Sequence, residues 1–277
     1  MLNAEVLVRQ PGVLPAMPRV VQSLIASLAD DEVPIRSIGI QLASDPVLTA
    51  KVLRVANSPY YRSARHVESV EEAIRILGIN SVRTLVMSAG LVSTFQPTPD
   101  FDMRRFWQHS VQTAAGAKAL AKYIHCDAEI AFTLGLMHGI GRLVMLSSMR
   151  DKLEPLDMVI GALPSPDRHN VEREAFGFSF ADVGAELAKQ WQFPEIYVRG
   201  MVQCMEPAAD EADAELFAAV DLAGWISRGE IDSLNRDVMS ALWPYDVALI
   251  AGLDREEVLT EFPVLKELAA GLEALIA

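Results

Sequence analysis

The chain has 277 residues, of which 51% are hydrophobic and 22% are charged, and its formal net charge at pH 7 is −13. The apolar content excludes a disordered chain, because it suffices for one large core or two modest ones. The negative charge argues against direct contact with nucleic acid or an anionic membrane surface, since both require clustered lysine and arginine. The exceptions are two arginine pairs, Arg62 with Arg65 and Arg104 with Arg105, whose pattern is typical of solvated helix ends.

Three further features predict a reduced, cytoplasmic protein. The cysteines, Cys126 and Cys204, are isolated and lack the spacing of metal ligands. Residues 1–10 carry no basic segment followed by an apolar core, so no export signal is expected. The most apolar window, residues 131–149, contains a histidine, an arginine and three glycines, and a buried helix explains it better than a membrane span.

The N-terminal part shows helical periodicity with clear start and stop signals. After Pro18, apolar residues recur at spacings of three and four up to residue 28, which predicts an amphipathic helix. Ser44, Asp45 and Pro46 combine cap residues with a proline suited to the first helical turn. They predict a helix that ends at Asn57–Pro59.

A short helix is predicted between Ser69 and Gly78. Ser69 stands three residues before Glu72 in a capping-box pattern, and Gly78 suits the left-handed conformation that ends many helices. Asn80 or Ser81 is expected to cap the following helix, which extends to about residue 91.

The rest of the chain is also helical in pattern, without strand alternation or a hairpin signature. Residues 96–100 hold two prolines among turn formers and predict a linker, and a second proline-bearing loop is expected at residues 163–167. Helices are predicted at residues 103–124, 128–149, 180–190, 194–203 and 213–227. The expected fold class is all-α with two helical lobes, at residues 12–96 and 101–210, and a C-terminal helical extension at residues 211–277.

His138 is the most informative single residue. It shares an apolar helical face with Ile130 and Leu134, which points it inward. A His-Asp pair would offer an imidazole and a carboxylate to one divalent ion, but Gly139 follows this histidine and has no metal-binding side chain. The residues thus favour a buried histidine bonded to its surroundings over a metal ligand. The three glycines of this segment are best explained by close helix packing.

Several ordered motifs together resemble the HDOD domain, the HD-related output domain of bacterial signalling proteins. They run along the chain as Leu14–Pro18, Leu42–Ser58, Glu72–Gly78, Phe106–Ser110 and Val183–Pro194. The resemblance covers roughly residues 12–205 and is more specific than any one short pattern. It implies an all-helical, HD-phosphodiesterase-like domain without the complete metal site of its relatives.

The resemblance also assigns positions of a vestigial HD site. His109 is the first histidine of that pattern, His138 is the second, and Gly139 stands where the aspartate belongs. Asp221 lies near the final acidic position, with Gly224 as the alternative in register. Other histidines of the pattern are replaced, near Phe180 or Ala181 and near Cys204 and Met205.

These residues are too few for a two-metal hydrolase, whose ions each need several histidines or carboxylates. No bound metal, cofactor or catalytic residue is therefore expected. A mononuclear site formed by His109, His138 and Asp221 is the alternative, since a catalytic zinc often has three protein ligands.

Two other features are candidates for contacts. One turn could present polar and aromatic groups to a partner, or it could end a helix and seal the lobe with its tyrosines; it comprises Asn57, Ser58, Pro59, Tyr60 and Tyr61. Arg142 could bind a phosphate, and the favoured alternative is an ion pair or a carbonyl contact near a helix end. The acidic tail has apolar positions that can pack on this chain or on a partner.

The expected function is that of a non-enzymatic output or adaptor protein that acts by protein–protein contact in bacterial signal transduction. Its expected partners are signalling proteins of two-component or cyclic-dinucleotide systems, and its apolar helix faces are also compatible with a homodimer. Two alternatives are a nucleotide-binding sensor that uses the vestigial HD cavity and a residual metal-dependent phosphohydrolase.

Overall fold

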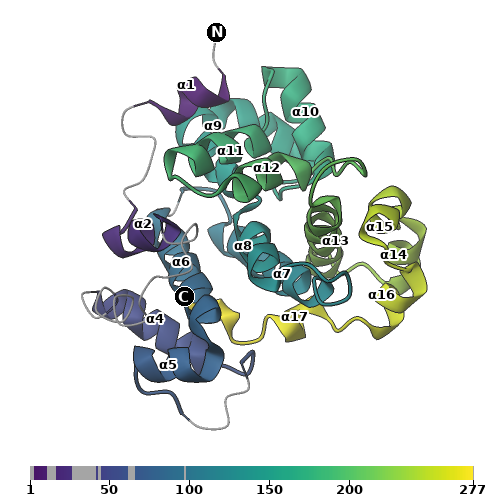
Figure 1. The fold of residues 1–277 in the computed structure, drawn as a ribbon. Helices are drawn as coiled ribbons and strands as arrows, with labels where there is room; N and C mark the ends of the chain where they lie inside the picture. Colours follow the sequence, from purple (N-terminus) through teal and green to yellow (C-terminus); the bar gives the residue numbers. More distant parts are fainter. Residues whose placement is uncertain are drawn as a thin grey trace.

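The computed structural model describes residues 3–10, 17–26, 42, 45–61, 66–96 and 98–276, and these form helices and turns with no strand (Figure 1). The all-α prediction is confirmed. Predictions that rest on residues 11–16, 27, 28, 43, 44, 62, 65 and 97 lie outside this described part. The N-terminal lobe contains α2 (Arg19–Ala26), α4 (Pro46–Ala56), α5 (Val70–Leu77) and α6 (Ile79–Thr94).

The second lobe is built around α7 (Met103–Leu120), which packs along α8 (Ala128–Met137) and α13 (Ala214–Ile231). Further helices lie above these in Figure 1: α9 (Ile140–Ile160), α10 (Pro166–Phe176), α11 (Phe180–Gln190) and α12 (Glu195–Gln203). Helix α1 (Ala4–Val8) packs on α11 and α9, so it belongs to this lobe although it precedes α2. Helix α13, which the sequence assigned to the C-terminal extension, packs on α7, α8 and α12 and so belongs to this lobe as well.

Most helix boundaries follow the predicted caps. The Asp45 side chain accepts a hydrogen bond from Leu48 N at 3.0 Å and starts α4, and the Ser69 hydroxyl accepts one from Glu72 N at 3.1 Å and starts α5. Gly78 ends α5 with a φ of 85° and directly precedes α6. The predicted cap at Asn80 or Ser81 is therefore wrong, because the chain turns at Gly78 without a side-chain cap.

The predicted helix at residues 128–149 is two helices. Helix α8 ends at Met137 and α9 begins at Ile140, so His138 and Gly139 form the break between them. The segment from Ala128 to Ile160 is long and apolar enough to cross a membrane, yet 89% of its most apolar window is buried inside the fold. The prediction of buried helix is confirmed. Helix α10 was not predicted, because Pro166, read as part of a loop, opens it.

After α13 the C-terminal extension forms a series of short helices. Those at the edge of the molecule are α14 (Arg236–Ala241), α15 (Tyr245–Ala251) and α16 (Arg255–Glu261). Helix α17 (Leu265–Leu268) then packs on α7, and the 3-10 helix η2 (Leu272–Leu275) reaches α4 in the other lobe. Leu265, Leu272 and Leu275 are fully buried, so the tail packs within this chain and bridges the two lobes.

Glycines allow backbones of the second lobe to touch. A Cβ on Gly135 would lie 2.7 Å from the Cα of Ala114, so α8 contacts the backbone of α7 there. A Cβ on Gly141 would overlap the carbonyl oxygen of Phe180, at the start of α11. Both positions confirm the prediction that these glycines serve close helix packing.

A network of buried charges ties α9, α10 and α11 together. Arg142 pairs with Asp157 within α9, and Arg168 of α10 pairs with Asp157 and with Glu172. Glu172 also accepts a hydrogen bond from Phe180 N at 2.7 Å. Arg142, Arg168 and Glu172 are completely buried, so each charge depends on these partners. Arg142 therefore makes the ion pair that the sequence favoured.

Gly141→Ala is expected to destabilise the fold by about 2–3 kcal/mol, because the added methyl group overpacks the contact between α9 and α11. Gly224→Ala is the matched control within a helix, since its Cβ would meet Arg228 Nη1 at 3.4 Å and the side chain of Thr113 at longer distance. At residue 224 alanine should leave the free energy of unfolding unchanged or raise it by up to about 1 kcal/mol. Urea unfolding at neutral pH compares the two, and equal effects would contradict this packing.

Arg168→Met is expected to cost about 3–5 kcal/mol of unfolding free energy, because Glu172 would remain buried without its close partner. Arg9→Met removes the exposed ion pair with Glu5 and should cost less than about 1 kcal/mol. Denaturant titration of both variants measures the difference. A cost for Arg168→Met as small as that for Arg9→Met would argue against the buried network.

Candidate functional site

The two histidines of the expected HD site meet in the centre of the second lobe. His109 lies in α7 and His138 follows the last residue of α8, and their Nε2 atoms are 3.2 Å apart. His109 is completely buried and His138 is 2% exposed. The structure thus brings together two of the residues that the sequence assigned to this site.

Hydrogen bonds fix the ring tautomers. His138 Nδ1 lies 2.6 Å from the carbonyl oxygen of Gly135, so this nitrogen must carry a proton and donate. In the neutral ring Nε2 then has no proton and accepts from Nε2–H of His109. Nδ1 of His109 consequently accepts from the Ser227 hydroxyl, at 2.9 Å. Both rings are satisfied as neutral imidazoles, in one continuous chain of donors and acceptors.

The surroundings oppose protonation of either ring. Burial lowers the pKa of His138 to about 4, and the positive charge of Arg228 acts in the same direction while the bond to Gly135 opposes it. Burial, followed by His138, Arg228 and Arg105, holds the pKa of His109 well below its usual range. A positive charge is therefore disfavoured at this pair.

The position of the missing aspartate is filled by packing. A Cβ on Gly139 would overlap Pro164 Cγ and lie 3.2 Å from the ring of Phe106. Arg228 donates a hydrogen bond to the carbonyl oxygen of Pro164 at 3.0 Å and so helps to hold this loop in place. An aspartate at residue 139 does not fit unless the loop moves.

The donor set does not suit a metal ion. Two imidazole nitrogens 3.2 Å apart could share one ion, but within the described residues no group of three or more His, Cys, Asp or Glu side chains is placed to hold a metal. The nearby cation is Arg228, whose charge would repel a divalent ion. The two ring nitrogens that could face an ion instead form a hydrogen bond with each other.

Asp221 lies buried in α13 and does not join the histidines in such a group. Burial raises its pKa to about 7, Arg228 opposes that shift and Asp167 adds to it. Gly224, the other residue that could stand at the final acidic position of the HD pattern, lies one turn further along α13 and has no side chain to bind a metal. The mononuclear site formed by His109, His138 and Asp221 therefore lacks its third ligand in this structure.

The candidate partner-contact turn is covered on one side by the tail of the same chain. Asn57 bonds to the backbone of Val67 at 2.7 and 2.8 Å, and Ser58 is buried. A Cβ on Gly271 would overlap Ser58 and approach Pro59 Cδ at 3.0 Å, which shows how closely the tail approaches. Pro59 is exposed, and a partner contact through this turn stays a prediction.

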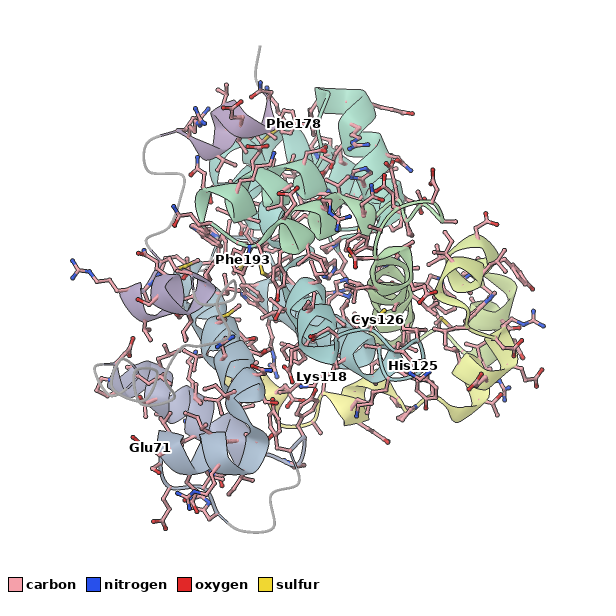
Figure 2. The ribbon with its side chains drawn as sticks, viewed as in Figure 1. Glu71, Lys118, His125, Cys126, Phe178 and Phe193 are labelled. Carbon is pink, nitrogen blue, oxygen red and sulfur yellow. The ribbon has the colours of Figure 1, made fainter. Side chains whose placement is uncertain are left out.

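The tyrosines of this turn face the second lobe. The rings of Tyr60 and Tyr61 pack edge to face, and Tyr60 also packs on Phe132 of α8. Lys118 lies between the lobes (Figure 2), 2.7 Å from Glu129 Oε1 and over the ring of Phe132. The tyrosines thus seal the junction between the lobes.

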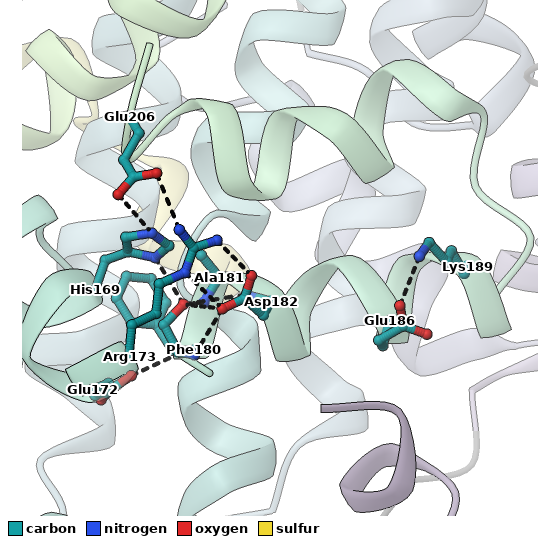
Figure 3. A network of polar contacts seen from close by, with 10 residues as sticks. His169, Glu172, Arg173, Phe180, Ala181, Asp182, Glu186, Lys189 and Glu206 are labelled. Carbon is teal, nitrogen blue, oxygen red and sulfur yellow. Dashed lines mark hydrogen bonds and ion pairs between the residues drawn. The ribbon is translucent and has the colours of Figure 1, made fainter. Parts of the chain in front are cut away.

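A second polar cluster was not anticipated from the sequence (Figure 3). His169 Nδ1 lies 2.7 Å from the Ser179 hydroxyl, and its Nε2 is 3.3 Å from Glu206 Oε1. Arg173 joins Asp182 and Glu206. The order serine, histidine, acid is that of a nucleophilic triad, but Ser179 is completely buried and caps α11 through the N–H groups of residues 181 and 182. The cluster is structural.

The sequence offered a partial signal for these buried groups. Arg168 and Glu172 stand four residues apart on one helix, a spacing that favours an ion pair. Ser227 and Arg228 gave no signal, because they contact His109 and Pro164 from distant positions in the chain.

Fold and site together define an all-helical domain of the HD phosphohydrolase-like type with a buried histidine pair, His109 and His138, and a glycine at residue 139. The family model of the HDOD domain matches residues 14–207, and the chain belongs to this family. The resemblance drawn from the sequence motifs is thereby confirmed.

Comparisons with known proteins agree on the fold. A crystal structure from Shewanella amazonensis SB2B, provisionally named a phosphohydrolase, is similar with a TM-score of 0.79 and 24% identity, over 98% of this chain and 100% of that one. A provisionally named signal transduction protein from Marinobacter aquaeolei VT8 has a TM-score of 0.69 and 22% identity, over 95% of this chain and 59% of that one. An uncharacterized protein of Treponema pallidum (strain Nichols) is 24% identical over 184 residues, which are 66% of this chain and 36% of that relative.

Acid should weaken the fold through His138. Below about pH 6.5, His138 takes up a proton in the unfolded chain but stays neutral in the folded protein, where its pKa is about 4. Protonation therefore stabilises the unfolded chain, and the free energy of unfolding decreases as the pH falls. Asp221 has the opposite slope between its ordinary pKa and about 7, so the test compares variants. Between pH 6.5 and 4.5, His138→Gln should lose stability less steeply than the wild type, by up to about 1.4 kcal/mol per pH unit.

Urea unfolding across this pH range gives the slopes. His66→Gln changes an exposed histidine and should keep the wild-type slope. If His138→Gln also keeps the wild-type slope, the loss of stability in acid does not come from His138.

Proposed function

We propose that this protein is a non-catalytic output domain of bacterial signal transduction, which acts by contact with other signalling proteins. The observation that carries the proposal is the replacement of the HD metal pair. His109 and His138 bond to each other, and Gly139 is packed against Pro164. A hydrolase of this type needs an ion to activate water, and these residues supply neither its carboxylate nor an open coordination position.

The burial of the pair supports the same conclusion. A phosphate ester must reach the nucleophile that attacks it, whereas His109 is completely buried and Pro164 covers the adjacent position. The provisional names of the two structural neighbours differ, phosphohydrolase for one and signal transduction protein for the other. The geometry of the site in this chain favours the second.

Exposed apolar side chains offer surfaces for a protein partner. Leu242, Tyr245 and Leu249 are 58%, 62% and 80% exposed on and between α14 and α15, at the edge of the molecule remote from the N-terminal lobe (Figure 1). Met158 and Val159, near the end of α9, are 85% and 81% exposed. Exposed apolar groups in clusters favour contact with another protein.

Metal content and phosphodiesterase activity test the proposal together. Purified protein is incubated with iron, manganese or zinc, desalted, analysed by elemental mass spectrometry and assayed with bis-p-nitrophenyl phosphate. We expect clearly substoichiometric metal and the same turnover for the wild type and for the His109→Asn/His138→Asn variant. Stoichiometric metal and turnover that both disappear in this variant would overturn the proposal and indicate a hydrolase.

A further inference from the structure

A groove beside α7, separate from the histidine pair, is a second candidate site. It has a volume of about 810 Å³ and lies between α7, the end of α6, α4 and the tail that follows α17. Its charged lining residues are Lys51, Arg104, Lys266 and Glu273. Three cations against one acid is an unusual balance on a chain whose net charge is −13. The groove therefore has a local potential that attracts anions.

The acids around this groove are already engaged by backbone N–H groups. Glu273 accepts from Gly271 N at 2.6 Å, and Glu230 accepts from Leu265 N and Lys266 N at 2.6 and 3.0 Å. Glu230 lines a neighbouring hollow that shares Arg104 and Lys266 with the groove. These carboxylates cap turns of the tail, so they are bound to backbone donors and not to the cations.

Two of the three cations, in contrast, are free to bind a ligand. The side chains of Arg104 and Lys266 are exposed and make no hydrogen bond or ion pair with the residues that the structure describes. Arg105, beside Arg104, is by comparison paired with Asp232. Lys51 donates to the carbonyl oxygen of Leu275 at 3.3 Å, and burial together with Arg54 lowers its pKa. An anion in the groove would supply the missing counter-charge.

The apolar wall indicates what kind of anion fits. Half-buried Phe95, Met103 and Ile276 line the groove, beside Gln108, whose amide can both donate and accept. Trp107 packs on Phe95 with the ring centroids 6.2 Å apart and is itself only 4% exposed, so it backs this wall. A planar ring can pack on such a wall, and an inorganic phosphate would leave it unused. The volume lies within the range of about 300–1,000 Å³ that is typical of small-molecule sites.

We infer that this groove binds a nucleotide, with its phosphate on Arg104 and Lys266 and its base against Phe95 and Met103. The site is separate from the vestigial HD cavity, and the inference does not depend on the absence of catalysis there. Gln112 lines the groove and lies 3.1 Å from the Ser227 hydroxyl, which bonds to His109. One polar side chain thus connects the groove to the buried histidines.

Isothermal titration calorimetry with AMP, GMP, ATP, GTP and the cyclic dinucleotide c-di-GMP tests the inference on the whole chain, with inorganic phosphate and guanosine as partial ligands. We expect saturable binding of at least one nucleotide, tighter than either partial ligand, that weakens with added salt. Arg104→Gln/Lys266→Gln should weaken it by about tenfold or more, since two charge-assisted contacts are lost. Arg75→Gln removes an exposed arginine of α5 and should leave affinity unchanged.

Three results would overturn the inference. They are no saturable binding at millimolar nucleotide, an affinity that Arg104→Gln/Lys266→Gln leaves unchanged, and phosphate that binds as tightly as the nucleotide. Thermal unfolding of each variant without ligand checks that the fold is intact. Chromatography of the nucleotide after incubation separates this question from that of hydrolysis, because an intact nucleotide supports binding alone and a cleaved one argues against the proposed non-catalytic function.

Discussion

The close approach of α7 and α8 is the constraint on which the centre of the molecule depends. At Gly135 the backbone of α8 touches the backbone of α7 at Ala114, and this contact leaves no room for intervening side chains. His109 and His138 stand close to this crossing, so their rings meet directly. The same Gly135 supplies the carbonyl oxygen that fixes the tautomer of His138. The close contact of α8 with α7 at Gly135 thereby determines which ring nitrogen of His138 carries the proton.

The loop that holds Pro164 is fixed from both sides. On one side, Asp157 and Gly161 of the α9 end bind Arg168, which starts the pairing with Glu172 in α10. On the other side, Arg228 of α13 binds the carbonyl oxygen of Pro164. Because buried charges are strongly held by their partners, the loop remains over Gly139. Fixed guanidinium groups thus hold the loop in place on both sides.

The sequence was sufficient for the fold class and for most helices, because caps such as Asp45 and Ser69 and the apolar periodicity act locally. It also pointed to His109 and His138, which the structure places in contact. Prediction from the sequence failed mainly where contacts between segments far apart in the chain decide the structure. The break between α8 and α9 and the short helices of the tail depend on packing between helices that are distant in the sequence. The helix that opens at Pro166 has a local signal that was overlooked, the Ser165 cap followed by a proline in the first turn. Arg104 and Lys266 belong to one groove only because the tail crosses α7.

The bridging tail also has a consequence for the order of assembly. During synthesis the N-terminal lobe and α7 leave the ribosome long before residues 265–276, which provide one wall of the groove and the buried leucines that join the lobes. The groove therefore does not exist in any shorter nascent chain. A prematurely ended product that lacks residues 265–276 therefore cannot form this groove.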